Sequence, residues 1–155
     1  SIKPDLLVLG KALSGGFYPV SAVLGDQEIM DVLTPGTHGS TFGGNPLACS
    51  IASASLDVIL NQKLTENSYK KGNFFRNELN LMKNKNIKEI RGMGLLNAVE
   101  TYEPEYAQEI HTKLLKEKKL TKITHSNKIR ISPPLIINNK QMNILLEKFN
   151  KALQL

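Results

Sequence analysis

The first part of the chain alternates short apolar runs with glycine-rich loops. Residues 6–9 (LLVL) form an apolar run that ends at Gly10, and residues 20–24 (VSAVL) form a second one. An apolar run of this length, bounded by turn residues, is typical of a strand that is buried on both faces of a sheet. Residues 14–19 and 35–45 are rich in glycine and polar side chains, so we expect loops there.

Helical periodicity begins after these loops. Asn45 and Pro46 have the residue types of a helix N-cap and first helical position, and apolar residues then recur at helical spacing to about Asn61. The next helix should begin at Thr65 and end near Asn84. The remaining pattern predicts a run of further elements: strands at 87–91, 95–100, 120–124 and 129–132, and helices starting at Pro104 and after Asn138. We therefore expect an α+β arrangement in the later part of the chain.

Composition and charge divide the chain near Asn61. Of its 155 residues, 41% are hydrophobic and 22% are charged, as is usual for a folded globular protein. Residues 1–60 hold two basic and five acidic residues, whereas residues 61–155 hold 18 basic and 9 acidic ones. No apolar run approaches membrane-spanning length, and the first residues lack an initiator Met and a signal-peptide pattern. We expect the natural start to lie upstream.

The formal net charge of +6 raises the possibility of nucleic-acid binding. The lysines of the basic part, however, are spread along helical patterns beside glutamates, without interleaved exposed aromatic residues or a zinc-finger spacing. A solvated face explains this pattern better than a nucleic-acid interface. The single cysteine, Cys49, stands among small apolar residues, which indicates a buried position.

Lys11 is the first candidate for chemistry. It follows the predicted strand at residues 6–9 and precedes a glycine loop, which would place its amine at a sheet edge where α/β proteins bind ligands. An unprotonated amine there could form a Schiff base. An ordinary surface lysine at a strand end is the alternative. A phosphate-binding P-loop is excluded, because Asp5 stands where that motif has its first glycine and Ala12 where it has Ser or Thr.

Hydroxyl groups precede the helix predicted after Asn45. Ser40 and Thr41 lie in a glycine-rich loop just before this helix N-terminus, which is the usual setting for phosphate binding. The alternative is a capping loop whose hydroxyls bond to their own backbone.

Arg130 leaves a short predicted strand whose other face is apolar, and two prolines follow it. A guanidinium can hold a carboxylate with two parallel hydrogen bonds, so an amino-acid or oxo-acid substrate would suit Arg130. A structural salt bridge is the alternative. Arg91 has the same choice, with the structural role favoured. No group of residues has metal-ligand spacing, so no metal site is expected.

Four segments together resemble the class III, or ω-amino acid, pyridoxal-phosphate aminotransferases. Residues 9–24 (LGKALSGGFYPVSAVL) resemble the cofactor-lysine segment of that family, and residues 38–47 (HGSTFGGNPL) resemble its second signature. Residues 91–96 (RGMGLL) and 130–135 (RISPPL) resemble its carboxyl-terminal landmarks. Within the family the chain is most similar to ornithine aminotransferases. Ser132 departs from the pattern, where a small apolar residue is expected.

The resemblance implies a fold and an assembly. The chain would be the carboxyl-terminal portion of an α/β, fold-type I transferase, with residues 1–65 closing the large cofactor domain and residues 66–155 forming the small α+β domain. The active site would lie between the two subunits of a homodimer. Lys11 would carry the cofactor as a Schiff base, while Thr41 and Ser40 would bind the cofactor phosphate of the partner chain. Arg130 would bind the substrate carboxylate.

The resemblance also implies an activity. The protein would transfer the δ-amino group of L-ornithine to a 2-oxo acid such as 2-oxoglutarate and release glutamate 5-semialdehyde, a reaction of proline biosynthesis and arginine metabolism. Acetylornithine and 4-aminobutyrate are the alternative amino donors, and a cofactor-free interaction domain is the non-enzymatic alternative. We expect small-molecule substrates, no nucleic-acid or membrane partner, and a cytoplasmic location, with the mitochondrial matrix as alternative. The 155-residue chain alone should be inactive.

Overall fold

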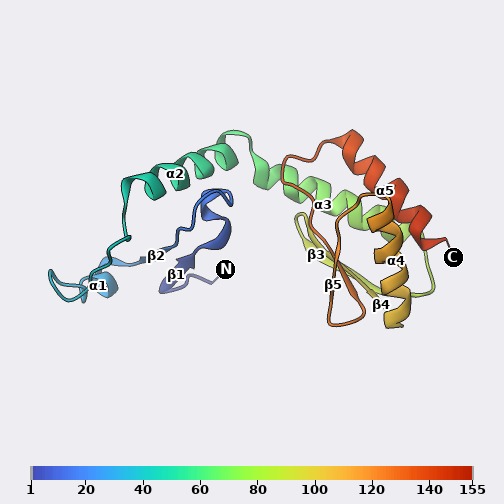
Figure 1. Cartoon of the computed structure of the whole chain (residues 1–155), viewed down its shortest axis with the longest axis horizontal. Coiled ribbons are helices and arrows are strands. Elements are labelled where there is room, and N and C mark those ends of the chain that lie inside the picture. Colours follow the sequence, from blue (N-terminus) through green and yellow to red (C-terminus); the bar gives the residue numbers. More distant parts are fainter. Residues whose placement is uncertain (1, 155) are drawn as a thin grey trace. The chain divides into compact units, whose positions relative to one another are not determined.

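The computed structural model describes residues 2–154 and divides the chain into two compact units, the first ending at Gln62 and the second starting at Lys63 (Figure 1). This division falls close to the border in charge and to the domain boundary expected at residue 65. We call these parts the first unit and the second unit, and each is described by itself.

The first unit consists of a two-stranded ribbon, three helical segments and long loops. Strand β1 (Leu6–Leu9) pairs antiparallel with β2 (Ala22–Gly25). The remaining elements are η1 (Lys11–Ser14), a single 3₁₀ turn, and the helices α1 (Gln27–Met30) and α2 (Pro46–Asn61). The predicted N-cap is confirmed, because the Asn45 side chain accepts a hydrogen bond of 2.9 Å from the amide of Ala48.

The prediction that residues 6–9 form a strand buried on both faces is half wrong. The strand exists, but Leu7 and Val8 remain 46% and 71% exposed. Its sheet has only two strands among the described residues, and the exposure of Leu7 and Val8 shows that their side chains are not buried there. The prediction that Cys49 is buried is also wrong, since its side chain lies on an exposed face of α2.

The second unit contains a four-stranded antiparallel sheet and three long helices (Figure 1). The sheet order is β3-β4-β6-β5. The strands predicted at 87–91, 95–100, 120–124 and 129–132 are confirmed, and so are the three predicted helices. The elements begin and end as follows: α3 (Leu64–Leu81), β3 (Ile87–Met93), β4 (Leu96–Thr101), α4 (Pro104–Lys116), β5 (Lys122–Thr124), β6 (Lys128–Ile131) and α5 (Asn139–Leu153).

One apolar core holds the second unit together. Helices α3 and α4 pack on the sheet, and α5 packs against both helices. Strand residues alternate between two faces, so Val99, Ile129 and Ile131 point into the core while their neighbours point away from it. Phe75 of α3 and Phe149 of α5 meet edge to face, with ring centroids 6.3 Å apart. The sheet therefore has an apolar face under the helices and an opposite, polar face.

Helix α3 fits closely against the turn between β3 and β4. A Cβ atom on Gly72 would lie 1.7 Å from the carbonyl oxygen of Gly94, so the helix can approach the turn only where it has no side chain. One turn to either side, the Ser68 hydroxyl accepts a hydrogen bond of 3.0 Å from the Leu95 amide, and Arg76 donates one of 2.9 Å to the Gly94 carbonyl. Gly94 itself has a φ of +53°, which favours glycine.

Candidate functional site

Lys11 lies where the sequence predicted it, directly after β1. It opens η1 with a φ of +53°, a left-handed conformation that is uncommon for residues with a side chain. Five other non-glycine residues in the described chain share a positive φ, so the backbone alone does not single out Lys11. Its side chain is exposed, which leaves the primary amine open to a reactive carbonyl group.

The loop after Lys11 has a defined shape. The buried Ser14 hydroxyl donates a hydrogen bond to the Tyr18 carbonyl and accepts one of 3.1 Å from the Tyr18 amide. Gly15 adopts a φ of +64° and passes so close to α2 that a Cβ atom there would lie 2.8 Å from the Ser55 hydroxyl. These contacts attach η1 to the helix and thereby hold the backbone that carries Lys11.

The segment before α2 is irregular, as predicted, and two of its side chains form local caps. The Ser40 hydroxyl accepts a hydrogen bond of 3.0 Å from the Gly43 amide, and the Asn45 side chain donates one of 2.8 Å to the Phe42 carbonyl. The Ser40 hydroxyl thus forms the local backbone cap that was the alternative to phosphate binding. Thr41 is exposed, and its hydroxyl makes no hydrogen bond within residues 2–154.

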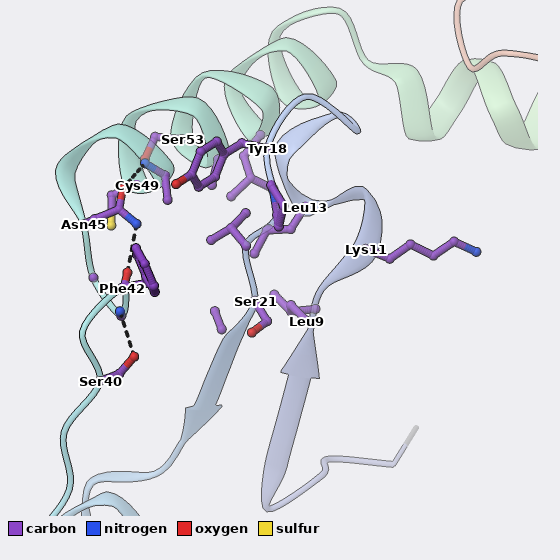
Figure 2. A pocket seen from close by; sticks show the side chains of 18 of the residues that line it. Leu9, Lys11, Leu13, Tyr18, Ser21, Ser40, Phe42, Asn45, Cys49 and Ser53 are labelled. Atoms are coloured by element: carbon purple, nitrogen blue, oxygen red, sulfur yellow. Dashed lines mark hydrogen bonds between the residues drawn. The ribbon is translucent and has the colours of Figure 1, made fainter.

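An open hollow of about 1370 Å³ lies between α2, β2 and η1. Its lining includes Lys11, Tyr18, Ser40 and Asn45, so the segments 9–24 and 38–47 border the same space. Figure 2 shows, however, that the Lys11 side chain points away from Ser40 and from the other labelled residues. Within the described residues, the Lys11 side chain therefore does not point toward the loop that contains Ser40.

Arg130 belongs to the second unit and lies on β6. Its neighbours Ile129 and Ile131 are buried, so the predicted apolar face of this strand is confirmed and the guanidinium points to the polar face of the sheet. Arg91 also lies on that face, but it pairs with Glu89 and with Glu100, the latter at 2.9 Å. The structural role favoured for Arg91 is the one observed.

Glu100 forms a charge cluster that the sequence pattern did not indicate. Its side chain, only 9% exposed, accepts hydrogen bonds of 2.9 Å from Lys88 and from Arg91, and the Lys128 amine lies 3.6 Å away. The hydrogen bonds from Lys88 and Arg91 lower the pKa of Glu100 from 4.5 to about 2. The cluster depends on the strand register, which places Glu100 opposite Glu89 on one side and Lys128 on the other. The hydropathy pattern does not reveal this register, so the sequence did not indicate the cluster.

Within residues 2–154, no three His, Cys, Asp or Glu side chains are grouped closely enough to hold a metal ion. No helix in the same range combines the length and apolar character needed to cross a membrane.

Comparison with known proteins identifies a family for the whole chain. The family described as aminotransferase class III matches residues 1–153. Ornithine aminotransferase 2 of Staphylococcus aureus is 46% identical over 154 residues, and the mitochondrial ornithine aminotransferase of Drosophila melanogaster is 45% identical over 152 residues. The alignments cover 99% and 98% of this chain but only 38% and 35% of those proteins. The chain thus spans somewhat more than a third of the length of these curated relatives.

Solved structures of the same kind superpose closely. An acetylornithine aminotransferase from Elizabethkingia anophelis matches with a TM-score of 0.92 and 48% identity, and the alignment covers 98% of this chain and 39% of that one. An ornithine aminotransferase from Toxoplasma gondii matches with a TM-score of 0.91 and 44% identity, covering 97% of this chain and 37% of that one. The expected α/β fold of this transferase class is therefore confirmed.

Proposed function

We propose that this chain, which belongs to the class III aminotransferase family, is the carboxyl-terminal part of an ornithine δ-aminotransferase that carries pyridoxal phosphate on Lys11. The family is pyridoxal-phosphate dependent. The observation that carries the proposal is the exposed amine of Lys11, which leaves the end of β1 on a backbone held by Ser14 and Gly15.

The residues present fit such a cofactor. Lys11 offers a primary amine, and Ser40 and Thr41 offer exposed hydroxyls in the loop that leads into the N-terminus of α2, whose positive dipole end favours a phosphate. The cofactor, when bound, supplies an electron sink for the bond broken at the substrate carbon. Lys11 would hold the cofactor through its amine, and the same amine, when free, would move a proton at that carbon.

Two subunits share the proposed site. Lys11 points away from Ser40, so a phosphate held near Ser40 and Thr41 suits a cofactor bound to the lysine of another copy better than one bound to the same chain. We therefore propose a homodimer in which Thr41, with Ser40, binds the phosphate of the partner's cofactor. The Ser40 oxygen accepts its hydrogen bond from the Gly43 amide, so the hydroxyl proton stays available to donate to an anion.

The amino donor is proposed to be L-ornithine, with a 2-oxo acid such as 2-oxoglutarate as acceptor and glutamate 5-semialdehyde as product. The support is the similarity to two curated ornithine aminotransferases at 45–46% identity. Acetylornithine is the second candidate donor, because the acetylornithine aminotransferase of Elizabethkingia anophelis is 48% identical. Arg130 would bind a carboxylate that both donors carry. A cytoplasmic location is proposed on the same similarity to bacterial relatives.

Reduction with borohydride tests the central assignment. The complete protein is loaded with pyridoxal phosphate, reduced, and digested, and the modified lysine is mapped by mass spectrometry. We expect the label on Lys11, and we expect Lys11→Ala to abolish both the label and amino transfer. Lys3→Ala, at an exposed lysine paired with Asp26 before the same strand, is the matched control and should retain both. A label on another lysine would overturn the proposal.

Comparison of amino donors tests the substrate. The complete protein is assayed with ornithine, acetylornithine and 4-aminobutyrate under the same conditions. Ornithine should give the highest kcat/KM. A higher value for acetylornithine would keep the family chemistry and replace the proposed donor.

A further inference from the structure

The turn that carries Lys11 is closed by one buried hydroxyl group. Ser14 is only 2% exposed, in a unit where Ala48 is the only other buried side chain among the described residues. Its hydroxyl donates a hydrogen bond to the Tyr18 carbonyl and accepts one of 3.1 Å from the Tyr18 amide. We call this pair of hydrogen bonds the Ser14 clasp. It satisfies a buried hydroxyl that would be costly to bury without partners.

Backbone hydrogen bonds connect the Ser14 clasp to Lys11. The Leu13 amide donates to the Gly10 carbonyl at 3.1 Å, and this bond spans Lys11. The Phe17 amide donates to the Ser14 carbonyl at 3.2 Å. Hydrogen bonds therefore close the turn on both sides, and these are contacts that the chain makes within itself.

One side of the turn rests on α2, and the lysine leaves from elsewhere on the turn. Gly15 approaches α2 so closely that a Cβ atom there would lie 2.8 Å from the Ser55 hydroxyl. Figure 2 shows the Lys11 side chain extending away from Leu13 and Tyr18. The amine stands at the end of a flexible four-carbon stem, so a small rotation of the turn on α2 moves the amine further than it moves the backbone.

We propose that Ser14 is a positioning residue, whose clasp holds the Lys11 amine where it can both bond the cofactor and move a proton at the substrate carbon. This inference rests on the proposed function, because it takes Lys11 to be the cofactor lysine. The left-handed backbone of Lys11, with a φ of +53°, is unfavourable for a residue with a side chain, so a turn without the clasp would relax to other conformations. Ser14 is buried and acts only through Lys11.

Two related ligands separate positioning from general damage to the fold. Pyridoxal phosphate forms a bond with a lysine amine, whereas pyridoxine phosphate has an alcohol in place of the aldehyde and binds without such a bond. In the complete protein, Ser14→Ala should raise the dissociation constant for pyridoxal phosphate about ten-fold and change that for pyridoxine phosphate by less than about two-fold. Absorbance and fluorescence titrations give the two values.

A serine in the second unit supplies the matched control for this titration. The Ser126 hydroxyl also donates to a backbone carbonyl, that of His125 at 2.7 Å, but it lies on an exposed turn. Ser126→Ala should therefore bind both ligands as the wild type does. Equal weakening of both ligands by Ser14→Ala would overturn the proposal, because it would indicate general damage, and so would unchanged affinity for both.

Conservative variants at position 14 keep the test sharp if Ser14→Ala folds poorly. Ser14→Thr keeps the hydroxyl and should restore most of the affinity for pyridoxal phosphate. Ser14→Cys keeps the size of the side chain but offers a weaker hydrogen-bonding group, so its affinity should lie between those of the wild type and Ser14→Ala. A loss in Ser14→Thr as large as that in Ser14→Ala would contradict the role of the hydroxyl.

Kinetics and hydrogen exchange of the complete protein give further readouts. Ser14→Ala should lower kcat roughly ten- to a hundred-fold and leave KM for the amino donor within about two-fold, because a misplaced amine slows proton transfer more than it weakens binding of the donor. Exchange of the Tyr18 amide should become faster in the cofactor-free protein. If the wild type carries the borohydride label on Lys11, faster exchange with unchanged kcat would overturn the positioning role. Failure of the proposed function looks different, because the label would then lie on another lysine.

Discussion

The two units of the chain divide chemistry and stability between them. The first unit contains Lys11, Ser40 and Thr41, yet only Ser14 and Ala48 are buried among its described residues. The second unit contains every member of the apolar core and, of the proposed site, only Arg130. Among the described residues, Lys11, Ser40 and Thr41 thus lie in a unit with few buried side chains, whereas Arg130 lies on the exposed polar face of the well-packed unit.

The largest expected difference appears when the two units are produced separately. Residues 63–155 should fold cooperatively, because they contain a continuous core of sheet and helices. Residues 1–62 should not, because a two-stranded ribbon with exposed apolar side chains is at best marginally stable in water. Circular dichroism during urea unfolding and amide hydrogen exchange would show this directly. A cooperative transition in residues 1–62 alone would break the comparison.

A matched pair of phenylalanine truncations measures the same difference within one chain. Phe149→Ala removes a fully buried ring that meets Phe75, and it should lower the free energy of unfolding of the second unit by about 3–5 kcal/mol. Phe42→Ala removes a ring of the first unit that is 78% exposed, and it should change that value by less than about 0.5 kcal/mol. Urea titration monitored by circular dichroism gives both values. Similar losses in the two variants would refute the assignment of the core.

Local sequence signals predicted most of the secondary structure. The N-caps Asn45 and Asn138 are present as read from the residue types, and Asn138 forms a complete capping box with Gln141. These elements depend on neighbours three or four residues apart, which the sequence shows directly. The turn at Gly94 lies in the gap between the strands predicted at 87–91 and 95–100.

Contacts between residues far apart in the sequence could not be predicted from local patterns. The apolar run at residues 6–9 indicates that a strand needs cover on both faces, but it does not say which segment provides it. Glu100 was missed because its partners Lys88 and Lys128 become neighbours only through strand register. Arg76 was missed in a polar, lysine- and asparagine-rich helix, because its contact with Gly94 depends on the absence of a side chain at position 72.

That close contact provides a test in which the usual effect of a substitution should reverse. Replacing glycine by alanine in a helix interior normally stabilises a protein. Gly72→Ala should instead lower the free energy of unfolding by roughly 1–3 kcal/mol, because its Cβ atom would overlap the Gly94 carbonyl oxygen. Gly39→Ala, in the first unit, meets nothing within 4 Å and should be nearly neutral. Stabilisation by Gly72→Ala in denaturant unfolding would show that α3 does not pack on the turn.

The smallest effect is electrostatic and depends on pH. Since the folded-state pKa of Glu100 is lowered to about 2 from an ordinary 4.5, the stability contributed by its carboxylate is complete above pH 4.5 and is lost as the pH falls through about 2. Glu100→Gln should therefore be less stable than the wild type at neutral pH, and the difference should shrink toward pH 2.

The first unit supplies the control for this pH effect. Its one ion pair among the described residues joins Lys3 and Asp26, whose side chains are 77% and 63% exposed, so solvent screens it. Asp26→Asn should consequently unfold like the wild type at every pH in urea titrations. If the difference in free energy of unfolding between Glu100→Gln and wild type stayed constant with pH, Lys88 and Arg91 would not hold the Glu100 carboxylate ionised. The two units would then not differ in the contribution of their ion pairs to stability.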